Sequence, residues 1–181
     1  MCVIEASPRL ETRRLVLRAP AERDAQRIAE LCGDLDIARM TTRMPHPYSL
    51  DDAKSFLAGV AYKDPAREPI FLLEHEDEGP VGMLGFHRNP EDQPELGPEM
   101  GYWVGKPFWG RGFATEAAQA ALNWAQRTWR RRAVVAGHFP DNPASGRVLT
   151  KAGFLYTGQV KRKPCLARGE LTDVRMMVWL A

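Results

Sequence analysis

Two glycines and an arginine stand between an aromatic segment and an amphipathic one, in the stretch WGRGFATE at residues 109–116. Gly110 and Gly112 allow a tight backbone turn, and because neither has a Cβ atom a ligand can approach the main chain closely. The free N–H groups at a helix start and the positive end of its dipole favour an anion such as pyrophosphate. Arg111 adds a positive charge, so the stretch predicts an anion-binding loop.

The spacing of these residues separates three classes of anion site. The Walker pattern is absent from the sequence, which disfavours a P-loop. A dinucleotide fingerprint needs a third glycine where Thr115 stands, and an acid about 20 residues later, where the chain has the basic run Arg130, Arg131 and Arg132. A nucleotide-dependent Rossmann protein therefore stays only as an alternative.

The loop needs a strand before it and a helix after it. Residues 100–104 have the aromatic and β-branched content of a strand, which Lys106 and Pro107 end. Ala117, Ala121 and Trp124 then fall on one face of a helix. The residues expected to face mostly away from the core are Glu116, Gln119, Asn123 and Gln126.

A second polar group follows a short apolar run at residues 133–137, which is typical of a buried strand parallel to the one before the loop. Asn142 is expected to cap the next helix, with Pro143 at its first position and its end near Lys151. Ser145 thus lies in the first turn of that helix.

The remaining elements follow from periodicity and helix-end signals. We expect a strand at 15–18, a helix at 24–31, a helix from Ser49 to about Ala61 with Phe56, Leu57 and Val60 buried, antiparallel strands at 69–73 and 81–86, a loop at 89–98, and closing strands up to Val160 and at 174–180. Lys161, Arg162 and Lys163 are expected in a solvated loop, or in contact with an anion.

Length and composition indicate one domain in a reducing compartment. The chain has 181 residues, 44% of them hydrophobic, and a net charge of +2, which does not favour general nucleic-acid binding. Cys2, Cys32 and Cys165 lack the spacing of a disulfide framework or a zinc site. Neither a signal peptide nor a membrane span is indicated, so we expect a cytoplasmic protein, either monomer or homodimer.

The order strand, Trp109, two residues, Gly112, one residue, Ala114, helix resembles the acetyl-CoA pyrophosphate loop of the GNAT acetyltransferases. The string around residues 101–117 and the opening segment 10–18 resemble the RimJ/RimL branch, the ribosomal-protein N-terminal acetyltransferases. The resemblance implies one GNAT-like α/β domain over residues 10–179, with a mixed, largely antiparallel sheet and a central acetyl-CoA-binding strand, loop and helix. The cofactor-binding residues it implies are Tyr102, Trp103, Val104, Trp109, Gly110, Arg111, Gly112, Phe113, Ala114, Thr115, Asn142, Ser145 and Lys151.

The same resemblance assigns roles in the second polar group. Many GNAT enzymes have a tyrosine where Leu149 stands, and it protonates the departing thiolate. RimJ/RimL-like members instead have a serine at the position of Ser145, which is expected to hydrogen-bond the sulfur of coenzyme A. A hydroxyl near a helix N-terminus can stabilise a developing thiolate. Asn142 is expected to bind the pantetheine arm as well as to cap the helix, and the alternative role for Ser145 is a helix-start residue alone.

A base is harder to identify. Glu99 is the candidate, because strand alternation places it on the same face as Gly101 and Trp103. Glu170 and Asp173 are later possibilities. The histidines, which we expect to be structural or exposed, are His46, His75, His87 and His138. At pH 7.5 a lysine is only about a thousandth neutral and an α-amine roughly a third neutral, so an α-amine needs less help from a base.

The sequence therefore predicts an N-acetyltransferase that transfers the acetyl group of acetyl-CoA to a primary amine, most plausibly a protein or peptide N-terminus. No metal is required. The alternatives are an acetyltransferase for a small amine such as an amino acid, a polyamine or an antibiotic, and a non-catalytic acyl-CoA-binding module. No specific nucleic-acid or membrane partner is indicated.

Overall fold

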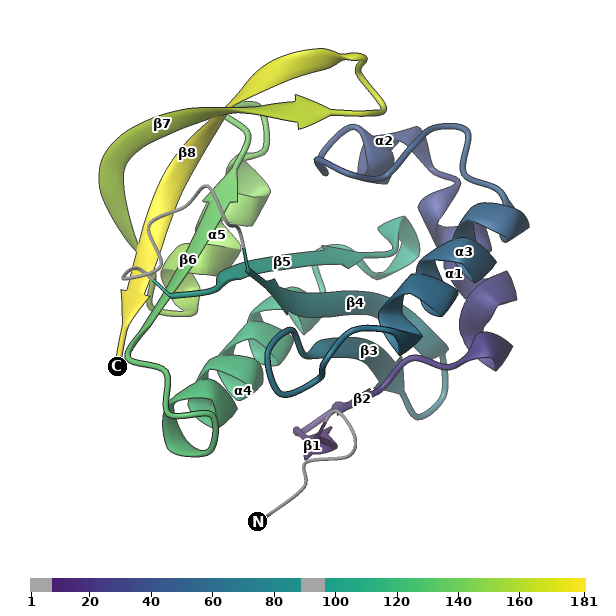
Figure 1. Ribbon diagram of the computed structural model, residues 1–181, viewed down its shortest axis with the longest axis horizontal. Helices are drawn as coiled ribbons and strands as arrows, with labels where there is room; N and C mark the ends of the chain where they lie inside the picture. Colours follow the sequence, from purple (N-terminus) through teal and green to yellow (C-terminus); the bar gives the residue numbers. More distant parts are fainter. Residues whose placement is uncertain (1–7, 89–96) are drawn as a thin grey trace.

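The computed structural model describes residues 8–88 and 97–181, and the described chain builds one eight-stranded sheet with helices on both faces (Figure 1). The strands lie in the order β1-β2-β3-β4-β5-β6-β8-β7. Cys2 and most of the expected loop at 89–98 lie outside the described residues. The elements are β1 Leu10–Glu11, β2 Leu15–Arg18, η1 Glu22–Asp24, α1 Ala25–Cys32, α2 Leu35–Ala38, α3 Leu50–Ala61, β3 Ile70–His75, β4 Gly79–His87, β5 Glu99–Val104, η3 Lys106–Phe108, α4 Phe113–Arg127, β6 Ala133–His138, α5 Pro143–Lys151, β7 Leu155–Cys165 and β8 Glu170–Leu180.

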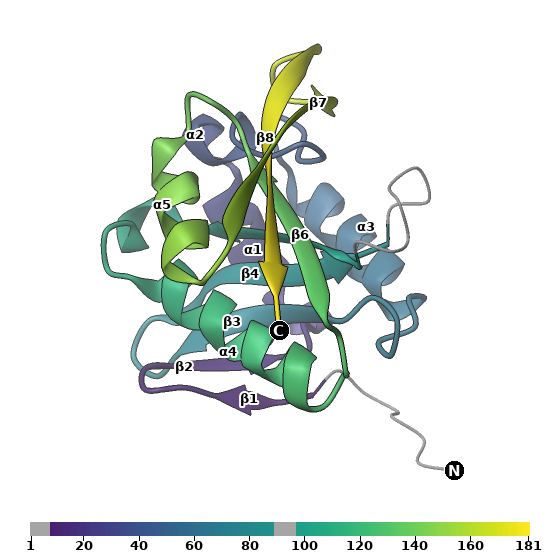
Figure 2. The same cartoon turned by 90° about the vertical axis from the view of Figure 1, so that its left-hand side faces the viewer.

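Two apolar clusters on opposite faces hold the helices to the sheet. Alternation in β3 sends Phe71 and Leu73 into the cluster under α4, and Ile70 and Leu72 into the cluster under α1 and α3. Figure 2 shows α5 and α3 on opposite sides of the sheet. The sheet is thus covered on both faces, and a ligand has access where its strands separate.

That separation occurs between β5 and β6, which are parallel whereas the other pairs of described strands are antiparallel. They meet at one register pair, Glu99 with Val135, and then run at a steep angle to each other (Figure 1). By contrast, β6 pairs with β8 along its whole length, from Ala133 to His138. The mixed, largely antiparallel sheet expected from the sequence is confirmed, including the parallel β5–β6 pair.

Two expectations about the outer elements were wrong. Phe56 was expected to be buried but is 39% exposed. The buried residues of α3 are instead Ala53 and Leu57, which lie one turn apart on the same face of the helix. The strand that was expected to end at Val160 continues to Cys165, so it contains Lys161, Arg162 and Lys163 as part of β7, and they do not lie in a loop. Their pairing with β8, for example Lys163 opposite Thr172, explains the longer strand.

Candidate functional site

The loop between β5 and α4 has the geometry of an anion cradle. Gly110 and Gly112 have φ values of +76° and +81°, in the left-handed region that favours glycine. Gly112 is the N-cap of α4, and no side chain caps that helix within the described chain. By contrast, Ser49 caps α3 and Asn142 caps α5, whereas α1 also lacks a side-chain cap. The first N–H groups of α4 are therefore available to a bound pyrophosphate.

A test of whether acetyl-CoA fits this loop is the space beside the glycines. A Cβ atom at Gly110 would meet nothing within 4 Å, and one at Gly112 would meet the end of the Arg14 side chain at 3.5 Å. The main chain is thus open on this side. Uncapped donors, open space and left-handed glycines together fit a diphosphate that approaches the backbone.

Two contacts hold the loop in place. The Trp109 indole Nε1 donates a hydrogen bond of 2.6 Å to the carbonyl oxygen of Val104, so the loop is fastened to the end of β5. Arg14 donates from its backbone N–H and its Nε to the Glu116 carboxylate, each at 2.8 Å, and from Nη1 to the carbonyl oxygen of Arg111 at 2.9 Å. Glu116 lies off the buried apolar face of α4, as expected, and Thr12 also donates to it at 2.7 Å.

Arg111 directs its charge away from the cavity described below. Its Nη1 lies 3.0 Å from an oxygen of Glu78, in the β3–β4 turn, and its guanidinium lies 4.7 Å from the centre of the Phe113 ring. The loop therefore offers backbone N–H groups, and the guanidinium of Arg111 serves the loop's conformation.

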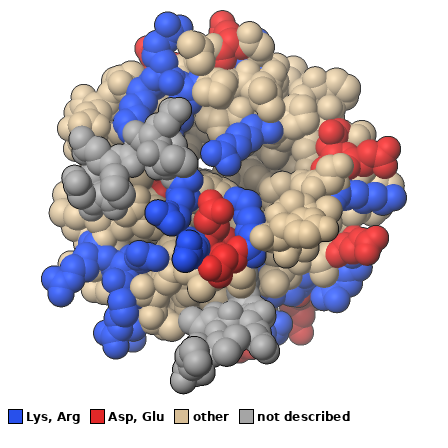
Figure 3. All heavy atoms as spheres, in the orientation of Figure 1, with Lys and Arg blue, Asp and Glu red and all other residues tan. Residues whose placement is uncertain are grey.

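A cavity of about 1560 Å³ opens where β5 and β6 separate. It brings together nearly all the residues singled out from the sequence. Those that line it are Glu99, Tyr102, Trp103, Val104, Trp109, Gly110, Gly112, Phe113, Ala114, Thr115, Asn142, Ser145 and Lys151. In the view of Figure 3, basic and acidic side chains mix around a hollow near the centre of this face.

One wall of the cavity is the start of α5. The Asn142 side-chain oxygen accepts a hydrogen bond of 3.1 Å from the Ser145 backbone N–H, as expected for a cap. The Tyr102 hydroxyl lies 2.8 Å from the Ser145 hydroxyl. Leu149 is completely buried, and its apolar side chain provides no hydroxyl group at that position. The Tyr102–Ser145 contact could not be anticipated from sequence spacing, since the two residues are 43 positions apart.

The opposite face of β5 forms the other wall. Glu99 lies at the cavity, and one of its carboxylate oxygens is 2.5 Å from the Lys163 Nζ. The His87 ring lies beside Gly85 and Gly101, and its Nδ1 is buried with no hydrogen-bond partner among the described residues. Burial, and then the positive charges of Lys63 and Arg43, lower the pKa of His87 to about 4. This imidazole is therefore neutral at physiological pH.

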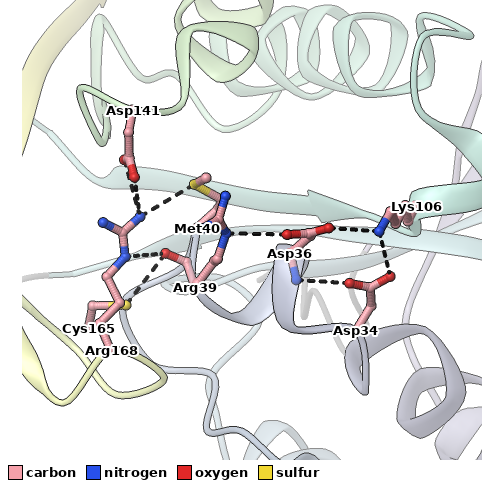
Figure 4. Close-up of polar contacts among 8 residues, drawn as sticks. All are labelled: Asp34, Asp36, Arg39, Met40, Lys106, Asp141, Cys165 and Arg168. Carbon is pink, nitrogen blue, oxygen red and sulfur yellow. Dashed lines mark hydrogen bonds and ion pairs between the residues drawn. The ribbon is translucent and has the colours of Figure 1, made fainter.

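The segment around α2 roofs the cavity and is fastened at both ends (Figure 4). At one end Lys106 lies 2.7 Å from Asp36 and 3.4 Å from Asp34. At the other end Arg168, in the β7–β8 turn, donates to the carbonyl oxygen of Arg39 at 2.7 Å and pairs with Asp141 at 2.9 Å. The Cys165 thiol also donates to the carbonyl oxygen of Thr41 at 3.1 Å. The turn of the β7–β8 hairpin thereby joins α2 to the start of α5 across the cavity.

Metal-binding clusters and membrane-spanning helices are both absent from the parts of the chain that the structure describes. Within residues 8–88 and 97–181, no cluster of three or more His, Cys, Asp or Glu side chains is arranged to hold a metal ion. Over the same residues, no helix is both long and apolar enough to span a membrane.

Comparisons with known proteins agree with this geometry. The family model of the acetyltransferase (GNAT) domain matches residues 14–155. An uncharacterised N-acetyltransferase of Bacillus licheniformis is 27% identical over 169 residues, which cover 92% of this chain and 93% of that protein. The ribosomal protein uS5-alanine N-acetyltransferase of Escherichia coli is 27% identical over 158 residues, with 84% and 81% of the two chains covered. The solved structure of Mycobacterium smegmatis RimJ in complex with CoA-disulfide superposes with a TM-score of 0.82 at 20% identity, covering 97% of this chain and 88% of that one.

Proposed function

The chain belongs to the GNAT acetyltransferase family and is an acetyl-CoA-dependent N-acetyltransferase, and on that premise we propose that its acceptor is the N-terminal α-amine of a protein or peptide. We infer that residues 10–179 act as one domain in the cytoplasm. Acetyl-CoA supplies an acetyl group on an activated thioester. What the chain supplies is the placement of that thioester beside the amine.

The proposed donor site uses both ends of the cavity. The N–H groups of Phe113, Ala114 and Thr115, at the uncapped start of α4, hold the pyrophosphate. Asn142 and Lys151 lie at the α5 wall of the same cavity and contact the rest of the cofactor. Holding two reactants in one geometry removes much of the entropic barrier of a bimolecular reaction.

In the proposed reaction the neutral amine attacks the carbonyl carbon of the thioester directly. A carbon–nitrogen bond forms, the carbon–sulfur bond breaks with its electron pair on sulfur, and the amine loses one proton. Glu99, at the cavity wall, is the proposed acceptor of that proton. Its contact with Lys163 holds the carboxylate in place at the cavity wall.

The observation that carries the acceptor class is the charge around His87. Burial lowers the pKa of this imidazole most, the positive charges of Lys63 and Arg43 lower it further, and the opposing effect of Glu68 is smaller than that of either cation. A cationic ammonium group in the same cavity is disfavoured by the same charges, so the acceptor reacts in its neutral form. An α-amine is roughly a third neutral near pH 7.5 and a lysine side chain only about a thousandth. The cavity therefore suits an α-amine.

The Escherichia coli relative is an N-acetyltransferase for the alanine of a ribosomal protein, which agrees with a protein acceptor. A second relative from that organism, 30% identical over 114 residues, is a ribosomal-protein-serine acetyltransferase. Their similarity to this chain supports the proposed class of acceptor.

An acceptor screen tests the proposal. Purified protein and acetyl-CoA are incubated with peptides that have free N-termini, the same peptides acetylated at the N-terminus, amino acids, polyamines and aminoglycosides, and free thiol is measured. We expect release with the free peptides and loss of release when their N-termini are acetylated. Release with small amines alone would assign the alternative acceptor class. Acetyl-CoA binding without release by any acceptor would indicate a non-catalytic acyl-CoA-binding module.

A further inference from the structure

Two hydroxyl groups meet at the cavity wall opposite Glu99. Tyr102, on β5, directs its side chain away from the face that carries Gly101 and Trp103, and it packs against the apolar cluster under α4. Its Oη lies 2.8 Å from Ser145 Oγ and 3.3 Å from the Ser145 carbonyl oxygen, and both residues line the cavity. The contact therefore connects the strand before the loop to the helix start across the cavity.

The number of protons and acceptors limits how this pair can be arranged. Ser145 uses its backbone N–H on Asn142, so its hydroxyl is the group that remains for a ligand. Each hydroxyl has one proton. When Tyr102 donates to Ser145 Oγ, the serine proton is not used in this contact and is free to point into the cavity. When Ser145 donates to Tyr102, the tyrosine proton has the more distant carbonyl as its acceptor. The 2.8 Å contact allows either oxygen to donate, and a sulfur atom that accepts the serine proton selects the first arrangement.

We propose that Tyr102 is a positioning residue that orients the Ser145 hydroxyl toward the sulfur of coenzyme A, so that the two residues act as one donor to the developing thiolate. The proposal rests on the donor half of the proposed function and not on the acceptor class. Ser145 donates a hydrogen bond and keeps its proton. The amine releases its proton to Glu99, which returns it to solvent, and the departing sulfur takes one proton from solvent, so the overall reaction is balanced without a net loss from the protein.

Two features of the surroundings strengthen this donor. The positive end of the α5 dipole favours negative charge beside Ser145. Burial raises the pKa of Tyr102 to about 12, so the phenol stays protonated over the working pH range and can keep donating. With Leu149 buried and apolar, the Tyr102–Ser145 pair supplies hydroxyl groups to this wall of the cavity.

The test measures the thiol of bound coenzyme A, and needs no acceptor. Free-thiol coenzyme A is bound to the protein, and its ionisation is followed between about pH 6 and pH 9.5 by the ultraviolet absorbance of the thiolate, after subtraction of the unbound protein. The variants are Tyr102→Phe, Ser145→Ala and the double variant. The control is Tyr156→Phe, whose hydroxyl contacts His138 Nε2 at 2.9 Å on the far side of α5. Calorimetric affinity for coenzyme A and melting temperature are recorded for each.

The thiol pKa is expected to rise by about one unit in Ser145→Ala and by about half a unit in Tyr102→Phe, because a charge-assisted hydrogen bond is lost or misdirected. The double variant should match Ser145→Ala, since Tyr102 acts through Ser145. Tyr156→Phe should titrate like the wild type. With an acceptor from the screen, kcat should fall about tenfold in Tyr102→Phe with little change in KM for acetyl-CoA.

A wild-type titration for Tyr102→Phe would overturn the proposal, as would an effect of Tyr102→Phe that persists in the Ser145→Ala background. A loss that follows a lower melting temperature would reduce Tyr102 to a packing residue and would also overturn it. Failure of the wild type to bind coenzyme A would contradict the donor site itself, and the affinity measurement separates that result from the others.

Discussion

At the scale of single residues, the chemistry depends on how each group's partners limit it. Glu99 was singled out from the sequence as the base, and its contact with Lys163 links the cavity wall to β7. That contact fixes the position of the carboxylate at the cavity wall. A neutral acceptor amine needs no deprotonation before it attacks, so the carboxylate has only to accept the proton that the amine loses on attack.

Replacing Glu99 tests this role through pH dependence. Glu99→Gln should lower kcat/KM for a peptide α-amine about tenfold near pH 6.5, where the acceptor is mostly protonated, and much less near pH 9. The measurement is the pH–rate profile of each protein. Lys163→Met serves as the matched control, because it removes the same ion pair and keeps the carboxylate. Parallel profiles for Glu99→Gln and the wild type would remove Glu99 from the mechanism. Identical losses in the two variants would indicate that only the ion pair matters.

The glycines of the loop allow a second test at this scale. Gly112→Ala places a Cβ atom at φ +81° and at the mouth of the uncapped helix. It should weaken acetyl-CoA binding about tenfold, equivalent to about 1.4 kcal/mol. Gly79→Ala is the control, because Gly79 has φ +66° and open space in the β3–β4 turn, so it carries similar backbone strain away from the cavity. Calorimetric titration should show the loss in Gly112→Ala alone, and equal affinities for both variants would contradict the loop's role.

At the scale of elements, an ion cluster fixes α1 to the sheet. Arg18 makes two hydrogen bonds to Asp24, at 2.8 Å each, and two to Glu74, at 2.8 and 2.9 Å. Burial alone would raise the pKa of Asp24, but the hydrogen bonds from Arg18 and from the Ala21 backbone N–H, together with the positive charges of Arg18 and Arg23, outweigh it and lower the pKa. The hydrogen bonds from Arg18 also lower the pKa of Glu74. Arg18 thus joins β2, β3 and the start of α1, which supports one side of the cavity.

The lowered pKa values set the pH dependence of stability. Carboxyl groups with depressed pKa values stabilise the fold above their unfolded pKa near 4, and this contribution is lost as the pH falls through the folded values. Arg18→Met should therefore lower the free energy of unfolding by about 2 kcal/mol at pH 7 and by less near pH 3. Urea unfolding at the two pH values measures the difference. Arg67→Met is the control, because Arg67 and its partner Asp64 are 69% and 53% exposed, and it should cost under about 0.5 kcal/mol. A constant difference across the pH range would contradict the account.

Local sequence signals identified most elements of this site. The left-handed glycines, the strand before them and the Asn142 cap each depend on a few adjacent residues, so pattern alone places them. The contacts across the site do not. Glu99 and Lys163 are 64 positions apart, and Arg168 reaches Arg39 over 129 positions. Such pairs depend on how the sheet brings β7 and β8 back over α2, and short α2 itself has too little periodicity to be found.

At the scale of the whole molecule, the separation of β5 from β6 divides the work between two walls. In the proposed function, one wall, from the loop and α5, receives the acyl donor with backbone N–H groups and hydroxyls. The other, from β4, β5 and β7, is proposed to meet the amine with Glu99, Lys163 and the neutral His87. The α2 segment and the β7–β8 turn close the space between them (Figure 4). This arrangement would place the thioester of acetyl-CoA on one side and the neutral amine that attacks it on the other.

The central claim is acetyl transfer to an α-amine, and one measurement tests it most directly. Two peptides of the same sequence length are compared as acceptors, one with a free N-terminus and no lysine, the other with a blocked N-terminus and a single lysine. Initial rates with acetyl-CoA near pH 7.5 are followed by mass spectrometry. The account predicts that the α-amine peptide is acetylated at least about tenfold faster, because roughly a third of its amine is already neutral, against about a thousandth of the lysine. Equal rates, or faster acetylation of the lysine peptide, would contradict it.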